Sequence, residues 1–449
     1  MLCMISVQNR RQPLSGNNKY IIVLLATVFL FASCGIFNGA QHDSTVSHPT
    51  NTDQTTVHAD TVIRKKVDSV IIPTKVIDNL ASEKKPAYDI SFVLPFSIDA
   101  AELEKLSSEE NITGFQPLAS IEFYEGALMA LDTLDSLGIK LNVHVFNNYK
   151  DSSLTAALFS KPEIMKSDAV FGPIFNESLK AASPVAQQNK FYLVSPLSPN
   201  NSFIDTNKYF MMANPTVEAQ LEAMLKSIET QHPFANIINI YRSDKPNEKH
   251  LADDFAAAFN IANTGKGMRL SNATSYAEAT ALMKSVENFV FISSYDELYV
   301  NGLIRDLSKF SRETPVEMLG LQHILSFESI SIDYYENLHF TYPNAYYIDR
   351  NSPKVINFET AFIERYSTRP SDFACRGYDF TLYIAMMLNS YGVDISASAD
   401  KLNPATPFML DPVRFTGIKN NAGITRYMEK SNITILRYDQ YIFKPLSAN

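Results

Sequence analysis

The chain has 449 residues, and 45% of them are hydrophobic, which is typical of a globular protein rather than a disordered one. It carries 39 basic residues against 48 acidic ones, a formal net charge of −9, and this acidic balance argues against a nucleic-acid partner. Three cysteines cannot build a disulfide framework, so burial of a hydrophobic core must stabilise the fold.

The N-terminus has the parts of a secretory signal. Arg10, Arg11 and Lys19 precede an apolar run over 20–31, which is too short for a transmembrane helix of about 20 residues. The sequence Phe-Ala-Ser-Cys that ends at Cys34 resembles the lipobox of bacterial lipoproteins, in which the cysteine is lipidated and becomes the first mature residue. We predict a signal peptide over 1–33 and lipidation of Cys34. An ordinary signal, in which Cys34 is only a small residue, is the alternative.

Stable anchoring by several acyl chains would place the protein in the bacterial cell envelope, facing the periplasm, with the outer membrane favoured over the inner. Residues 34–87 are rich in Thr, Ser, Asp, Asn and Lys and contain one aromatic side chain, Phe37. Such a segment cannot bury enough apolar surface to offset its chain entropy, so we expect a flexible tether. The globular part should then begin at Tyr88.

A first series of buried strands alternates with amphipathic helices, which predicts a parallel sheet covered on both faces. Strands are expected at 90–96, 141–146, 169–172 and 191–194, with helices at 121–131, near Leu154 and at 176–189.

A second series of similar composition follows, so we predict two α/β lobes with a cleft between them. Its helices are expected at 216–231, 253–261, 277–286 and 297–310, and its strands at 237–241, near Arg269, at 289–292 and at 316–321. Two further helices are expected at 354–366 and 372–391. The turn at 420–423 between strand-like runs, which finish at 433–443, indicates a terminal hairpin.

With these elements in order, the chain resembles the leucine-binding-protein-like group of the type I periplasmic-binding-protein family over nearly all of 88–449. The segments that carry the resemblance are Phe-Val-Leu-Pro-Phe at 92–96, the helix at 127–134, Phe-Gly-Pro at 171–173 with Ser178, Pro-Val-Ala at 184–186, Leu-Val-Ser-Pro at 193–196 and Gly-Tyr-Asp-Phe at 377–380.

The resemblance implies two Rossmann-like lobes with parallel sheets flanked by helices and joined by a three-strand hinge. Lobe 1 would comprise about 88–212 and 343–400, and lobe 2 about 213–342 and 401–449. Within the family, the chain also looks similar to the LppC-like outer-membrane lipoproteins that activate peptidoglycan synthases. Amino-acid specificity is not supported, because the segment 197–200 is Leu-Ser-Pro-Asn where amino-acid binders keep small hydroxyl residues, and the turn at 420–423 is Asn-Asn-Ala-Gly in place of a turn that contains Phe-Asp.

The sequence contains no nucleophile elbow, Walker loop or dinucleotide fingerprint, and its eight histidines are scattered without partners at metal-ligand spacing. We therefore expect neither an enzyme nor a metal or cofactor site. Cys375, in the sequence Phe-Ala-Cys, is interpreted as core filler.

Ligands of open parallel sheets bind beyond the carboxyl ends of the strands. This rule predicts ligand contacts from Asn176, Ser195 and Ser198 in the first lobe and from Tyr241 and Tyr295 in the second. Each has a structural alternative: Asn176 as the N-cap of its helix, Ser195 within a Ser-Pro turn, and Tyr295 as a core ring beside a helix cap at Asp296. Arg376 and Asp379 are interpreted as structural ion-pair members, with ligand contacts as the alternative.

Two classes of function fit these features. One is a lipid-anchored protein that captures or senses a small polar ligand between its lobes. The other is a lipoprotein that keeps the fold but docks and regulates a cell-envelope enzyme, as the LppC-like resemblance suggests. A cleft filled by Phe175, Leu197 and Tyr295 would favour docking, whereas an open polar cleft would favour a small ligand.

Overall fold

The computed structural model describes residues 82–97, 116–265, 267–284, 287–396 and 410–446, which belong to one compact unit of the chain. The predicted signal peptide, the lipidation site Cys34 and the tether up to residue 81 lie outside the described residues and stay predictions. None of the described helices combines the length and the apolar composition needed to cross a bilayer.

The first sheet has seven strands in the order β11-β12-β5-β4-β3-β1-β2, and only the β11–β12 pair is antiparallel. We refer to this sheet and its helices as lobe 1. Its strands are β1 (Tyr88–Leu94), β2 (Leu141–Asn147), β3 (Ala169–Phe171), β4 (Tyr192–Ser195), β5 (Phe210–Met212), β11 (Phe415–Lys419) and β12 (Thr425–Lys430). Its helices are α3 (Gln116–Ser136), α4 (Ser152–Phe159), α5 (Pro162–Met165), α6 (Asn176–Asn189), α12 (Pro353–Tyr366) and α13 (Asp372–Tyr391).

The second sheet also has seven strands, in the order β14-β13-β10-β9-β8-β6-β7, and is parallel from β10 to β7. This sheet and its helices form lobe 2. Its strands are β6 (Asn236–Ile240), β7 (Arg269–Ala273), β8 (Asn288–Ile292), β9 (Val316–Leu319), β10 (Thr341–Asn344), β13 (Thr434–Asp439) and β14 (Ile442–Pro445). Its helices are α7 (Val217–Gln231), α8 (Pro246–Ala262), α9 (Tyr276–Ala281), α10 (Glu297–Phe310), the 3-10 helix η1 (Gln322–Ser326) and α11 (Ile332–Asn337).

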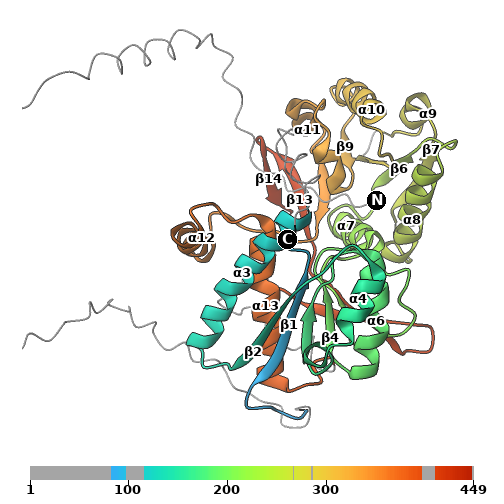
Figure 1. Ribbon diagram of the computed structural model, residues 1–449. Coiled ribbons are helices and arrows are strands. Elements are labelled where there is room, and N and C mark those ends of the chain that lie inside the picture. Colours follow the sequence, from blue (N-terminus) through green and yellow to red (C-terminus); the bar gives the residue numbers. More distant parts are fainter. Residues whose placement is uncertain (1–81, 98–115, 266, 285–286, 397–409, 447–449) are drawn as a thin grey trace, which may run out of the picture. The chain divides into compact units, whose positions relative to one another are not determined.

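Both faces of each sheet are buried, because alternate residues of a strand point to opposite sides. In lobe 1, Phe92 packs in the core under α3 and α13, and Val93 packs in the core under α4 and α6 (Figure 1). In lobe 2, Ile238 packs under α9 and α10, whereas Phe289 packs under α7 and α8. Burial on both sides requires the continuous apolar runs that the sequence shows. The predicted fold, two α/β lobes with mostly parallel sheets flanked by helices, is confirmed.

Two glycines allow α3 and α13 to pack in close contact. A Cβ atom at Gly126 would lie 1.8 Å from the carbonyl oxygen of Ala374, and one at Gly377 would lie 1.8 Å from that of Phe123. Any side chain larger than hydrogen would therefore push the helices apart. This contact confirms that the helix at 372–391 belongs with the N-terminal strands, although more than 150 residues separate them.

The chain passes between the two sheets three times, through the crossover segments 213–216, 345–352 and 431–433. The prediction that all of 401–449 joins lobe 2 is wrong for the first hairpin. β12 pairs in parallel with β5 and β11 pairs with β12, so this hairpin extends the sheet of lobe 1, and only β13 and β14 join lobe 2. Hairpin pairing is decided by which edge is unoccupied, and that information is not in the local sequence.

The predicted tether also ends earlier than residue 87. The Ser82 hydroxyl donates to the Tyr391 carbonyl at 2.9 Å, and the backbone amide of Val393 donates to the Glu83 carbonyl at 3.1 Å. The Lys85 ammonium lies 2.7 Å from a carboxylate oxygen of Asp168. Residues that look like linker residues thus bond the end of α13 and Asp168, and the described structure begins six residues before β1.

Candidate functional site

The carboxyl ends of the parallel strands in each lobe position the predicted contact residues. β4 ends at Ser195 and leads into the loop with Ser198, and α6 begins at Asn176 shortly after β3. In lobe 2, Tyr241 directly follows β6 and Tyr295 follows β8 by three residues. The sequence therefore located the correct strand ends in both lobes.

In lobe 1 the two serines are structural supports rather than accessible groups. Ser195 and Ser198 are fully buried. The Ser198 hydroxyl donates to Oδ1 of Asn176 at 2.6 Å and accepts from the backbone amide of Asn200 at 3.2 Å. Asn176 is half-buried, and its Nδ2 group has no partner among the described residues. Ser198 thus orients the Asn176 amide so that its donor end stays available.

The alternative in which Asn176 caps its own helix is wrong. The N-cap of α6 is Phe175, and no side chain there bonds the first turn. Phe175 and Leu197 are buried in the hydrophobic core of lobe 1 with Phe171 and Val194. These two large side chains therefore pack inward and do not fill the space beyond the strands.

In lobe 2, Tyr295 is 48% exposed, so the alternative in which its ring belongs to the core is wrong. Its ring centroid lies 4.7 Å from that of His323, which is buried. Burial lowers the pKa of His323, so the imidazole is neutral and donates its Nε2 hydrogen to the Ser294 carbonyl at 2.9 Å. The fixed imidazole packs against the exposed Tyr295 ring. Tyr241 is half-buried, and its backbone amide is bonded to the Ala273 carbonyl.

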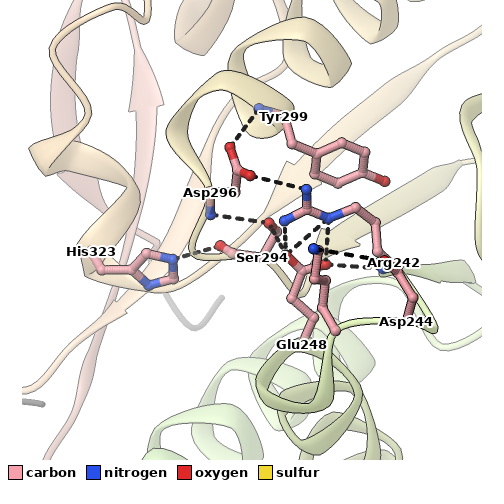
Figure 2. A network of polar contacts seen from close by, with 8 residues as sticks. Arg242, Asp244, Glu248, Ser294, Asp296, Tyr299 and His323 are labelled. Carbon is pink, nitrogen blue, oxygen red and sulfur yellow. Dashed lines mark hydrogen bonds and ion pairs between the residues drawn. The ribbon is translucent and has the colours of Figure 1, made fainter.

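Beside these tyrosines lies the Arg242 cluster, made of Arg242, Glu248, Ser294, Asp296 and Tyr299 (Figure 2). Nε of Arg242 lies 3.1 Å from both carboxylate oxygens of Glu248, which is only 3% exposed, and its Nη2 also bonds that carboxylate. Nη1 of Arg242 lies 3.0 Å from Oδ2 of Asp296, whose other oxygen caps α10 at the Tyr299 amide. The predicted cap at Asp296 is confirmed.

The charge of Arg242 is therefore fully matched. The Ser294 hydroxyl donates to Glu248 at 2.6 Å, and the Tyr299 ring lies 4.4 Å from the guanidinium carbon. Burial alone would raise the pKa of Glu248, but hydrogen bonds from Arg242 and Ser294 lower it below its ordinary value. Two carboxylates on one guanidinium leave no free positive charge here for a ligand.

The crossover segments are joined by a second set of charges, the hinge cluster, made of Tyr346, Asp379, Asp411 and Lys430. The fully buried Lys430 ammonium donates to the carbonyls of Ala345 at 2.6 Å and Asn432 at 2.7 Å, and lies 3.4 Å from Asp411. Burial lowers the pKa of Lys430 and raises that of Asp411, and the attraction between their charges opposes both shifts. One ammonium group thus bridges the second and third crossovers.

Asp379 is held by groups other than an arginine. It accepts from the Tyr346 hydroxyl at 2.5 Å and from the backbone amides of Leu410 and Asp411, both at 2.8 Å. Burial raises its pKa to about 7, against the lowering effect of these hydrogen bonds. The predicted ion pair of Arg376 with Asp379 is wrong, since no salt bridge joins them. Cys375 is buried, as expected for core filler.

The first crossover is bonded both to β12 and to the loop of lobe 1 that follows β4. The Thr216 amide donates to Oε1 of Glu429 at 2.7 Å. The Ala213 amide donates to the Ser195 carbonyl at 2.9 Å, and Nδ2 of Asn214 donates to the Leu197 carbonyl at 2.9 Å. The loop that holds Ser198 is therefore attached directly to the hinge.

Sequence reasoning missed Glu248, Lys430, Asp411 and Tyr346. Local pattern offers little signal for them, because a Glu or Lys in a polar stretch is typical of a solvated surface. Only the tertiary fold brings Glu248 into the Arg242 cluster and the other three residues into the hinge cluster. Among the described residues, no group of three or more His, Cys, Asp and Glu side chains is placed to hold a metal ion.

Comparison with solved structures shows what this fold is similar to. A protein from Rhodospirillum rubrum assigned to a branched-chain amino acid ABC transporter is 14% identical, with a TM-score of 0.57, and the match covers 80% of this chain and 99% of that one. A branched-chain amino acid ABC transporter protein from Rhodopseudomonas palustris is 14% identical, with a TM-score of 0.55, over 80% and 96%. A periplasmic ligand-binding protein from Burkholderia xenovorans is 11% identical, with a TM-score of 0.52, over 80% and 94%.

At these identities the likeness concerns the fold alone. No curated protein sequence matches the chain significantly. The family described as the receptor family ligand binding region matches residues 124–421, well over half of the chain. The chain belongs to this family, and its fold is that of the type I periplasmic binding proteins.

Proposed function

We propose that the protein is a non-catalytic binding protein that captures a small polar ligand between lobe 1 and lobe 2. The observation that carries the proposal is the pairing of accessible polar groups at equivalent strand ends. Asn176 presents an amide in lobe 1, and Tyr241 and Tyr295 present phenol rings in lobe 2. A ligand that contacts both lobes favours their closed arrangement, because only that arrangement lets one molecule bond to both.

The packing of Phe175 and Leu197 supports a ligand rather than a docked enzyme. Both side chains lie in the lobe 1 core, so two of the three large residues that could fill the cleft do not. No described feature favours the LppC-like alternative specifically. The proposal names no ligand class, although several similar structures are proteins of amino-acid transporters; the charge of Arg242 is already paired with Glu248 and Asp296.

The experiment is a thermal-shift screen of the full chain against amino acids, sugars, nucleosides and organic acids. A ligand that binds only the folded state raises the melting temperature with concentration. Asn176→Ala and Tyr295→Ala should each weaken its binding by about 2- to 10-fold, the loss of one hydrogen bond or ring contact. Asn189→Ala at the other end of α6 and the exposed Tyr441→Ala are matched controls, and both should bind like the unaltered protein.

If no compound shifts the melting temperature, or if the lobe 2 variant binds normally while the lobe 1 variant does not, capture between the lobes is wrong. If a cell-envelope enzyme co-purifies with the protein, and still does so with both site variants, that result would support docking.

We further propose that the protein is anchored in the bacterial envelope through a lipidated Cys34. The apolar run at 20–31 and the lipobox-like sequence before Cys34 support this. Mass spectrometry of the membrane fraction should find acyl chains on Cys34, and Cys34→Ala should release the protein from membranes. An unmodified Cys34 at the mature N-terminus would contradict the anchor.

A further inference from the structure

Arg376 differs from the other arginines that are described and not exposed. Arg242, Arg426 and Arg437 each bond a carboxylate or a backbone carbonyl. Arg376 is half-buried, and among the described residues it has neither an ion pair nor a hydrogen bond. Its Nε atom is buried without a partner, and its guanidinium carbon lies 5.3 Å from the centroid of the Tyr346 ring.

The carboxylates near Arg376 are already engaged. Asp379, one helical turn further along α13, accepts from Tyr346 and from two backbone amides. Asp411 faces Lys430. Lys430 is close enough for its charge to act against that of Arg376, and it lies 5.6 Å from the Tyr346 ring that Arg376 also approaches. No carboxylate among the described residues is therefore paired with the Arg376 guanidinium.

A partly buried cation without a partner is costly, so native proteins retain one where something else supplies the missing acceptor. Arg376 also lies beside the crossover segments, which contact the loops of the candidate site. Tyr346 lies in the second crossover, Lys430 bonds the carbonyl of the preceding residue, Ala345, and the first crossover bonds Ser195 and Leu197. Arg376 thus lies against the second of the three crossover segments that join the lobes.

We propose that Arg376 recognises a carboxylate group of the ligand, which identifies that ligand as a carboxylate-bearing small molecule. The inference rests on the proposed function. A guanidinium offers parallel N–H donors that match the two oxygens of a carboxylate, and its single charge balances a single negative charge. The neutral groups Asn176, Tyr241 and Tyr295 would contact the remainder of the molecule, where a ring or an amphipathic chain suits the tyrosines.

The test compares two compounds of the same shape. Phenylacetate carries a carboxylate and a ring, and phenylacetamide replaces the carboxylate with a neutral amide. Thermal shift and calorimetry on the full chain, at constant ionic strength set with sodium chloride, measure both. Unaltered protein should bind phenylacetate at least about 10-fold more tightly than phenylacetamide. Arg376→Gln should lose that difference, Arg376→Lys should keep part of it, and the exposed Arg369→Gln should keep all of it.

Equal binding of the two compounds, or normal phenylacetate binding by Arg376→Gln, overturns the inference. So does a failure of phenylacetate to stabilise the unaltered protein. The proposed function is judged separately by the metabolite screen: a neutral ligand that depends on Asn176 and Tyr295 but not on Arg376 would leave that function standing and this inference wrong.

Discussion

The Arg242 cluster and the surroundings of Arg376 hold the same type of side chain in opposite conditions. Arg242 is bonded to two carboxylates, a buried one from α8 and the N-cap of α10, and its charge is neutralised within lobe 2. Arg376 lies beside an equally acidic pair, Asp379 and Asp411, but a tyrosine, two amides and a lysine already occupy those carboxylates. Arg242 is therefore a structural cation, whereas Arg376 has no hydrogen-bond acceptor among the described residues.

The difference shows how a protein can keep a partly buried cation free of protein partners, so that the cation can bind a ligand. Where both partners of a pair are buried together, removing one leaves the other uncompensated and costs a large part of the folding free energy. Where a cation has no protein partner, removing it costs little and affects only what it binds. Stability and ligand affinity should therefore separate cleanly between the two regions.

The largest effect is expected at the hinge. Lys430→Met removes the ammonium that lies 3.4 Å from the buried Asp411 and leaves the Ala345 and Asn432 carbonyls without its hydrogen bonds. We expect a loss of about 3–5 kcal/mol in the free energy of unfolding, measured by urea denaturation. Lys444→Met, which breaks the half-exposed pair with Asp439, should cost less than about 1 kcal/mol. Equal losses in the two variants would show that the hinge charges are not buried as described.

Arg242→Gln should have the next largest effect. It leaves Glu248 buried with the Ser294 hydroxyl and one backbone amide as its remaining donors. Because the Arg242 side chain is itself partly exposed, we expect a loss of about 2 kcal/mol rather than the full cost of a buried pair. The matched control is Arg305→Gln on the exposed pair with Asp306, which should be nearly neutral. A neutral Arg242→Gln would mean that the cluster does not stabilise lobe 2.

The two regions should also respond to pH with opposite signs. Burial raises the pKa of Asp379 to about 7, so the folded state holds a proton that the unfolded state releases above about pH 4. Its contribution to the free energy of unfolding therefore falls as pH rises from about 4 to 7, by up to about 1.4 kcal/mol per pH unit. The pKa of Glu248 is lowered, so its contribution is present above about pH 4 and is lost as pH falls further.

Urea unfolding between pH 5 and pH 7 measures the contribution of Asp379 to the free energy of unfolding. The free energy of unfolding of Asp379→Asn should decline less steeply with pH than that of the unaltered protein. Parallel pH profiles would contradict a protonated Asp379 in the folded state.

Much of the fold could be predicted, because long apolar periodic segments specify their own elements. The helices at 176–189, 297–310 and 372–391 were predicted to the residue, and the strand ends at Ser195 and Tyr241 were located within a residue. The short strands β5 and β10 were missed. Three or four residues carry no measurable period, and these strands form only because neighbouring strands offer them an edge.

The strand ends that carry the candidate site were predicted, but the exposure of the side chains there was not. Strand order identifies which loops meet, so Asn176 and Tyr295 could be found from sequence. Whether a side chain in such a loop is buried or accessible depends on tertiary packing, and Ser195 and Ser198 proved to be buried supports. The interpretation of Arg376 and Asp379 as an ion pair failed for a similar reason, because Tyr346, which competes for Asp379, comes from a different crossover.

The most direct measurement is the urea unfolding of Arg376→Gln with and without phenylacetate, beside Arg242→Gln and the Arg369→Gln control. Without the compound, Arg376→Gln should lose less than about 1 kcal/mol, because no protein group is left uncompensated. With phenylacetate, the unaltered protein and Arg369→Gln should gain stability with concentration, and Arg376→Gln should gain little. A loss in Arg376→Gln as large as that in Arg242→Gln, together with an undiminished gain from phenylacetate, would contradict the assignment of Arg376 as the ligand's partner.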